Sequence, residues 1–178
     1  MKKRTKKTII WTAVAAGLAA GAIALIARKG IQELTMKKLA TLIGITEPAI
    51  YRHFESKTRI MIAVLDFFQE QVGEVFRAAA DSRLTPLGEL ELVVASLCRR
   101  FAESPTVASA IFAEDLFRND ARLAARVVRM MHDGSRRFEA IVARGVRQGE
   151  LRSDVTVEQV AQIIVGSLRL LVTRWRLG

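Results

Sequence analysis

The residues that could carry out catalysis are few, and their spacing does not assemble a reactive site. His53 and His132 are far apart in the sequence, and neither stands in a serine or cysteine nucleophile pattern. Glu114 and Asp115 form a carboxylate pair, but neighbouring residues on a helix point apart, which favours a solvated surface. The sequence has no phosphate-binding loop, dinucleotide fingerprint or metal-ligand motif. We therefore expect a protein that is not an enzyme and that needs no metal and no cofactor.

Basic charge is concentrated in the first third of the chain. Residues 1–60 hold 12 lysines and arginines against three acids, whereas residues 61–178 hold 16 arginines against 15 acids. All eight lysines stand at or before Lys57. A basic module joined to a near-neutral one is typical of a polyanion-binding head with a separate body. The alternative is a basic tail that only aids solubility.

The pattern of breakers predicts an all-α fold with a sizeable core. Hydrophobic residues make up 51% of the 178 positions, and only Pro48, Pro86 and Pro105 interrupt the chain. Long stretches lack both proline and glycine, which favours helices over short strands. Cys98 stands alone in an apolar stretch, which excludes an internal disulfide and indicates a buried structural thiol.

Residues 31–59 carry the start and stop signals of two short helices. Thr35 is a good N-cap for a helix that ends at Gly44, where glycine can take a left-handed turn. Thr46 is a second N-cap, and Pro48 follows in the first turn, where its missing N–H costs nothing. Two capped helices joined by a glycine turn are typical of a helix-turn-helix, whose second helix enters the major groove of DNA. An ordinary helical hairpin is the alternative.

The apolar positions of this stretch agree with a helix-turn-helix. The second helix is expected to run to about Phe54, and Ser56 is expected to cap a third, long helix. The residues predicted to form one small core are Leu39, Ala40, Ile43, Ile45, Ile50 and Phe54.

The same stretch resembles a known family. Its pattern T-M-x-x-L-A-x-x-I-G-I-T-E-P-A-I-Y-R-H-F-x-S-K closely matches the DNA-binding signature of the tetracycline-repressor (TetR) family of transcriptional regulators. The match is strong over Leu34–Lys57 and weak along the rest of the chain. It implies an N-terminal three-helix DNA-binding domain followed by a C-terminal helical bundle. The function implied is that of a repressor that binds an operator.

The resemblance also implies which residues touch double-stranded DNA. The residues expected near base edges are Thr46, Glu47, Pro48 and Ala49. The residues expected on the phosphate backbone are Thr35, Tyr51, His53 and Lys57. Free N–H groups at helix N-termini favour such phosphate contacts. As ordinary alternatives, Tyr51 packs beside the small core and His53 is a surface histidine.

The remaining segments read as helices over about 57–80, 85–102, 104–117, 120–147 and 156–176. Thr156 opens the last of them with a T-x-x-Q capping box, and Gly149 ends the helix before it. The residues of the first long helix predicted to face inward are Ile60, Val64, Phe67, Phe68, Val72, Val75 and Phe76.

By the resemblance, this C-terminal bundle binds a small apolar effector and forms a homodimer. The residues that are candidates for an effector pocket are Phe101, Phe112, Phe117, Met130 and Met131, with a filled core as the alternative. Effector binding would favour a spacing of the two DNA-binding units that no longer fits the groove. The family's final helix is expected to be missing here, which would expose Leu170, Leu171 and Trp175.

The N-terminus departs from the family pattern. Residues 9–27 contain no charge and stand between a basic leader and Arg28-Lys29, which meets the length rule for a transmembrane helix. The alternative is an alanine-rich first helix that the following residues bury. The family's first helix is polar and amphipathic, and residues 11–22 look like about ten extra uncharged positions. We expect a cytoplasmic protein, with anchoring to the cytoplasmic membrane as the alternative location.

These patterns predict three parts. Residues 1–27 form a basic leader and an apolar segment, residues 28–60 the helix-turn-helix domain, and residues 61–178 an incomplete effector-binding and dimerisation domain. The alternative function is that of a membrane-anchored helical interaction protein with a basic helix-turn-helix head.

Overall fold

A computed structural model describes residues 17–26, 28–29, 33–103 and 120–177, and these residues include helices and no strand. The first described segment, residues 17–26, is helical. The helices after it are α2 (Met36–Ile43), α3 (Glu47–Tyr51), α4 (Lys57–Asp81), α5 (Pro86–Glu103), α7 (Ala121–Arg147) and α8 (Val157–Leu177). The predicted all-α fold is confirmed, whereas the helix expected over 104–117 lies outside the described residues.

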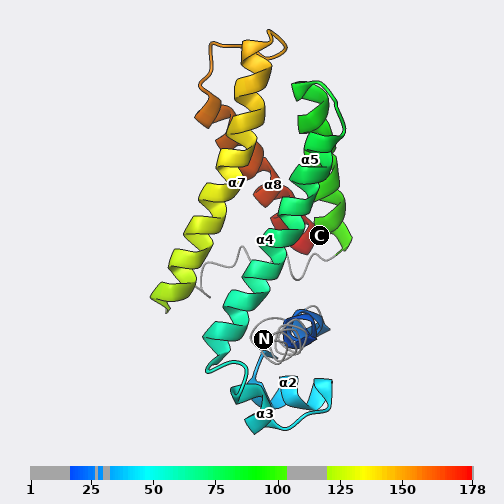
Figure 1. The fold of residues 1–178 in the computed structure, drawn as a ribbon, viewed down its shortest axis with the longest axis vertical. Coiled ribbons are helices and arrows are strands. Elements are labelled where there is room, and N and C mark those ends of the chain that lie inside the picture. The colour runs from blue at the N-terminus through cyan, green and yellow to red at the C-terminus, as the bar shows by residue number, and fades with distance from the viewer. Residues whose placement is uncertain (1–16, 27, 30–32, 104–119, 178) are drawn as a thin grey trace, which may run out of the picture.

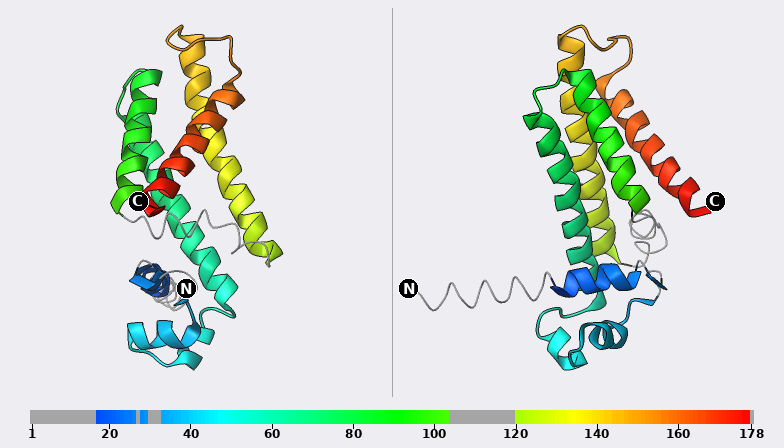
Figure 2. Two further views of the ribbon diagram at one scale, coloured as in Figure 1. Left: turned by 180° about the vertical axis from the view of Figure 1, so that it is seen from behind. Right: turned by 90° about the vertical axis from the view of Figure 1, so that its right-hand side faces the viewer.

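The long helix α4 connects two parts of the molecule. Its first turns lie beside α2 and α3, which with residues 17–26 form the part that we call the head (Figure 1). Its later turns pack against α5 and α7, and α8 packs across α5 and α7 to complete the body. Residues 17–26 run crosswise between the body and the pair α2 and α3 (Figure 2). The head and the body therefore share one continuous helix.

Each part has its own hydrophobic cluster. The buried residues of the head cluster are Leu18, Ala22, Leu25, Ile26, Leu34, Met36, Leu39, Ala40, Ile50, Phe54, Ile60, Met61, Val64, Leu65 and Leu123. The buried residues of the body cluster are Val75, Phe76, Ala79, Leu90, Val93, Leu97, Phe101, Phe138, Ile141, Val142, Ala161, Leu168 and Val172. Burial of these apolar side chains removes their surface from water, and this hydrophobic effect is the main stabilising contribution in each part.

The two clusters meet along α4 and α7. Leu123, in the first turn of α7, is 6% exposed. It belongs to the head cluster although the other buried members of that cluster lie between residues 18 and 65. Phe68 of α4 packs against both clusters. Polar contacts follow the same seam, because Thr58 donates to Asp120 at 2.6 Å and Gln69 donates to Asp133 at 2.9 Å. The start of α7 is thus fixed to the head by packing and by hydrogen bonds.

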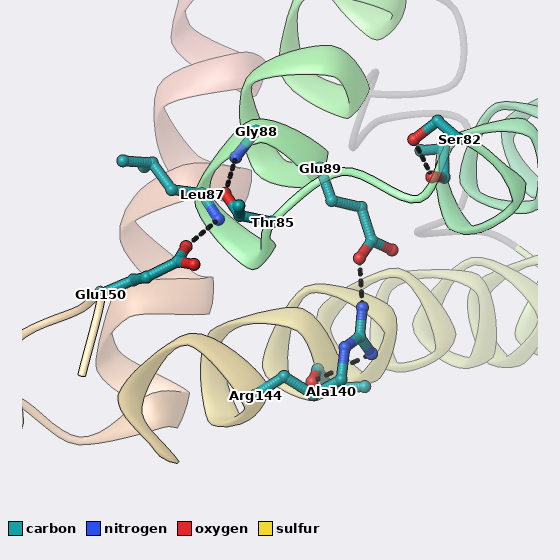
Figure 3. Close-up of polar contacts among 9 residues, drawn as sticks. Ser82, Thr85, Leu87, Gly88, Glu89, Ala140, Arg144 and Glu150 are labelled. Atoms are coloured by element: carbon teal, nitrogen blue, oxygen red, sulfur yellow. Dashed lines mark hydrogen bonds and ion pairs between the residues drawn. The ribbon is translucent and has the colours of Figure 1, made fainter. Parts of the chain in front are cut away.

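At the other end of the body, α5 and α7 are joined by a buried ion pair. Glu89 is 7% exposed and pairs with Arg144 (Figure 3). Glu150 accepts a hydrogen bond from the backbone N–H of Leu87 at 3.1 Å, which holds the end of α7 against the start of α5. A carboxylate buried this deeply is stable only when a partner balances its charge.

Four of the expectations from the sequence can be compared with the structure. The prediction that Phe67 faces inward is wrong, since its side chain is 48% exposed while Phe68 carries the contact between the clusters. The helix α3 ends at Tyr51 rather than near Phe54, and Phe54 is buried through a turn in which its N–H donates to Ile50 at 2.9 Å. Cys98 is only partly buried against the body cluster. The expected exposure on α8 is confirmed for Leu170, Leu171 and Trp175.

Candidate nucleic-acid interface

The helix α2 begins and ends as its sequence predicts. The side chain of Thr35 accepts a hydrogen bond from the N–H of Lys38 at 3.2 Å, which caps the first turn. Gly44 takes φ 75° and ψ 30°, and its N–H donates to Ala40, as does that of Ile45. A left-handed residue at this point is favourable for glycine and lets the chain reverse within a tight turn. The turn brings α3 back against α2.

The helix α3 is anchored by one fully buried side chain, while two of its others are exposed to solvent. Ile50 is fully buried in the head cluster, whereas Thr46, Pro48 and Tyr51 are exposed, with Tyr51 at 50%. Thr46 has the extended backbone of an N-cap, but its hydroxyl makes no capping hydrogen bond. That prediction is therefore right for the backbone and wrong for the side chain, and the hydroxyl stays available to an outside partner.

The exposed surface formed by Thr46, Pro48 and Tyr51 extends to the start of α4. Ser56 caps the helix by accepting from the N–H of Arg59 at 3.3 Å, and Lys57 in the first turn is exposed. Glu47, Ala49 and His53 are partly buried at the edge of the same surface. A capped N-terminus with a lysine beside it presents positive charge in a form that suits a phosphate.

Residues 17–26 belong to the head rather than standing apart from it. Leu18, Ala22 and Ile26 are 1%, 0% and 1% exposed within the head cluster. Gly21 lies so close to α2 that an added Cβ would be 3.0 Å from the side chain of Ile43. Among the described residues, no helix combines the length and the apolar character needed to span a bilayer. The rest of the candidate membrane segment, residues 9–16 and 27, lies outside the described residues.

A small cavity opens among α4, α5, α7 and α8 in the body. Its volume is about 100 Å³, and most of the described residues that line it are apolar. The apolar and glycine residues around it are Phe68, Val72, Phe76, Leu97, Phe101, Met130, Met131, Gly134, Phe138, Val165 and Leu168. The polar residues among the described part of the lining are Gln69, Asp133 and Arg137. The rings of two of these lining residues, Phe68 and Phe101, stack against each other with centroids 5.8 Å apart.

Models of known protein families match both the N-terminal and the C-terminal region of the chain. Residues 18–64 match the family described as "Bacterial regulatory proteins, tetR family". Residues 85–177, more than half of the chain, match "Tetracyclin repressor-like, C-terminal domain". The chain belongs to the tetR family. As a tetR-family protein it is a DNA-binding transcriptional regulator, and the predicted family membership is confirmed.

The curated relatives carry names that describe different roles. The chain is 27% identical over 138 residues to the nucleoid occlusion factor SlmA of Alteromonas mediterranea, an alignment that covers 77% of this chain and 68% of that one. It is 28% identical over 160 residues to the probable HTH-type transcriptional regulator ArpR of Pseudomonas putida, with 84% and 74% covered. The chain spans 61% of the SlmA of Photobacterium profundum.

Solved structures share the tetR-family fold. The fatty acid degradation regulator FadR from Bacillus halodurans matches with a TM-score of 0.81 and 17% identity over 92% of this chain and 84% of that one. The FadR of Bacillus subtilis, in complex with stearoyl-CoA, matches with a TM-score of 0.75 and 21% identity over 90% and 86%. A TetR-family regulator from Agrobacterium tumefaciens matches with a TM-score of 0.82 and 19% identity over 93% and 88%.

The structure brings together part of the predicted effector set. Phe101, Met130 and Met131 all line the cavity, whereas Phe112 and Phe117 lie outside the described residues. Sequence reasoning missed Arg137 and Asp133. One signal was present, because Arg137 stands seven positions after Met130 and three after Gly134, which places a charge on the helix face that Met130 and Gly134 share.

Proposed function

We propose that this tetR-family regulator reads its operator with α3 and holds the phosphate backbone with the ends of the flanking helices. The observation that carries the proposal is the surface of α3, where Ile50 is buried and Tyr51 beside it is 50% exposed. The residues proposed at base edges are Thr46, Glu47, Pro48 and Ala49, and those proposed at phosphates are Thr35, Tyr51, His53 and Lys57. Phosphate contacts would set the register, and base contacts the sequence preference.

The protein acts as a homodimer in this proposal. One head contacts a single half-site, and a two-fold pair places two heads roughly 34 Å apart along the duplex. The body offers apolar surface for such pairing, because Ile163, Leu170 and Trp175 on α8 are 64%, 59% and 41% exposed. A second copy that covers this face of α8 would remove these side chains from water.

A small apolar effector in the body cavity would regulate DNA binding. Met130 lines the cavity and also packs against the head cluster, so a ligand there touches a residue that supports the head. In the FadR of Bacillus subtilis, the same fold is seen with stearoyl-CoA. We propose that effector binding moves α7 against α4, changes the spacing of the two heads and releases a repressor from its operator in the cytoplasm. The three-part division at residues 27 and 60 stays a prediction.

Selection from a random duplex pool tests this function directly. The full chain is incubated with the pool, and the bound duplexes are sequenced. Recovery of two-fold symmetric sites, with half-sites about 10 base pairs apart, is expected for a dimer that inserts two copies of α3. Binding to the selected duplex should weaken about tenfold or more between roughly 50 and 200 mM salt. Recovery of single, asymmetric sites would refute the dimer, and binding insensitive to salt would refute the phosphate contacts.

A further inference from the structure

One arginine that lines the cavity of the body carries a charge that the described residues do not balance. Seven arginines lie on α7, and three of them are partly buried: Arg126, Arg137 and Arg144. Arg126 pairs with Asp66, and Arg144 pairs with Glu89. Arg137 forms no ion pair with any residue in the described part of the chain, although it lines the cavity.

The neighbouring carboxylates are already engaged. Asp133, which also lines the cavity, accepts from Gln69 at 2.9 Å and pairs with Arg136. Hydrogen bonds from Arg136 and then Gln69 hold the pKa of Asp133 below its usual value, so this carboxylate is ionised. On α4, Glu70 pairs with Arg77 at 2.7 Å. The negative charge near Arg137 is therefore committed to other cations.

The contacts of Arg137 leave its hydrogen-bond donors available. Its guanidinium carbon lies 5.6 Å from the ring centroid of Phe76, another lining residue. The aromatic ring attracts the positive charge of the guanidinium and takes up no N–H donor. The five N–H donors point outward in the guanidinium plane and can still donate hydrogen bonds. Gly73 lies beside the guanidinium, because a Cβ there would be 3.7 Å from a terminal nitrogen of Arg137, which is an ordinary contact distance. A planar carboxylate matches two of these donors at once.

We propose that the cavity binds a small monoanion, an apolar body of a few carbon atoms with one carboxylate, and that Arg137 binds the carboxylate. This inference rests on the proposed effector function. The volume of about 100 Å³ limits the apolar body, since a cavity of about 150 Å³ holds benzene. A single unbalanced arginine favours one negative charge, because a dianion would remain only half neutralised.

A series of ligands with one apolar body and three charges tests the proposal. Hexanoate, 1-hexanol and hexylamine are titrated into the full-length protein by calorimetry, with no DNA present. Hexanoate is expected to bind about tenfold more tightly than hexanol, because a charge-assisted hydrogen bond outweighs a neutral one even at a partly exposed group. Hexylamine is expected to bind more weakly than both.

The variant Arg137→Gln removes the charge and keeps most of the side-chain stem. It should weaken hexanoate binding about tenfold and leave hexanol binding unchanged, a split that a merely structural role of Arg137 would not produce. Arg137→Lys should recover part of the preference. Arg129→Gln is the matched control, because Arg129 lies exposed on the same helix outside the cavity lining and its loss should change neither affinity.

Each outcome decides the inference. Equal binding of hexanoate and hexanol, no binding of either at about 10 mM, or a hexanoate preference that survives Arg137→Gln would overturn it. The effector function is measured in a separate experiment, as release of the selected duplex from the protein when the ligand is added. If hexanoate and hexanol bind and release DNA equally, the effector function stands and the inference falls. If hexanoate binds preferentially without releasing DNA, the inference stands and the effector function falls.

Discussion

The hydroxyl of Thr58 donates a hydrogen bond to the carboxylate of Asp120 at 2.6 Å, across 62 positions of the sequence. Thr58 follows Lys57 in the first turn of α4, and Asp120 caps α7 by accepting from the N–H of Arg122 at 2.9 Å. One carboxylate thus caps the start of α7 and accepts a hydrogen bond from the first turn of α4. This contact ties the proposed DNA-binding surface to the helix that carries Arg137.

Replacing Thr58 should loosen this connection. We expect Thr58→Val to lower the free energy of unfolding by about 1 kcal/mol, because it removes the donor and leaves the carboxylate with one partner fewer. Urea denaturation followed by circular dichroism measures the change. Thr173→Val serves as the control, since Thr173 is exposed on α8 and its hydroxyl donates only within its own helix, to Arg169 at 3.0 Å. Equal losses in both variants would show that the Thr58 contact contributes nothing specific.

Stability should fall in acid, partly through Asp120. The hydrogen bond from Thr58 holds the pKa of Asp120 below its usual value, which is about 3.9 in an unfolded chain. A lowered pKa in the folded state stabilises the protein above about pH 4 and loses this effect as the pH falls through the folded value. The stability difference between the protein and Asp120→Asn should therefore narrow below about pH 4. Urea midpoints at a series of pH values measure it, and a difference that stays constant would contradict the assignment.

Two substitutions in the head separate DNA contact from folding. Lys57→Gln should reduce the dependence of log affinity on log salt by about one unit, because one phosphate contact is lost. Tyr51→Ala should weaken binding while changing stability by no more than about 0.5 kcal/mol, since Tyr51 is 50% exposed. Fluorescence anisotropy with the selected duplex measures both effects. Arg147→Gln, at the far end of α7 from the head, is the control for lost positive charge. Unchanged affinity in both head variants would remove Tyr51 and Lys57 from the interface.

A glycine of α7 should tolerate no side chain. An added Cβ at Gly145 would lie 2.6 Å from Leu151 and 3.2 Å from Pro86, where the ends of α5 and α7 meet. Gly145→Ala should lower the free energy of unfolding by about 1–3 kcal/mol through overpacking. Gly166→Ala on α8 meets nothing within 4 Å and should instead raise stability, by up to about 1 kcal/mol. Thermal unfolding measures both changes, and a stabilising Gly145→Ala would show that Leu151 moves aside freely.

The buried ion pair between α5 and α7 provides a fifth test. Arg144→Met leaves Glu89 buried without its partner and should cost about 2 kcal/mol, a value reduced because the Arg144 side chain is 39% exposed. The double variant Glu89→Leu with Arg144→Met should regain most of that loss, because no buried charge remains. Guanidinium denaturation of the single and double variants measures the recovery. A double variant no more stable than the single one would mean that packing, not charge, sets the cost.

The local features of the head could be predicted from the sequence, because they depend on residues close together in the chain. Thr35, Gly44 and Ser56 act within one helical turn, and all three behave as expected. Thr46 differs because its backbone follows the helix start while its hydroxyl does not bond to it. Cap preferences describe average behaviour and do not fix one side-chain rotamer.

The cavity could be predicted only in part, because it depends on contacts between distant residues. Phe101, Met130 and Met131 are apolar at helical spacing, so they were expected inside the body. Arg137 was not singled out, since seven arginines on α7 look alike in the sequence. Only the packing of α4 beside α7 shows which of them is partly buried and lacks a carboxylate among the described residues. The prediction for Phe67 was wrong for the same reason. Adjacent residues on a helix point in different directions, so the sequence does not show which of Phe67 and Phe68 faces the core, and Phe67 is exposed.

The place of Leu123 in the head cluster has a consequence for synthesis of the protein on the ribosome. A nascent chain that has reached Leu65 already contains α2, α3 and the start of α4, yet the side chain that closes their core has not been made. Domains generally fold in order as the chain emerges, at about 5–20 residues per second. We therefore expect the head to finish packing only after α7 has begun to leave the exit tunnel, so that a chain terminated before Leu123 lacks a complete head core.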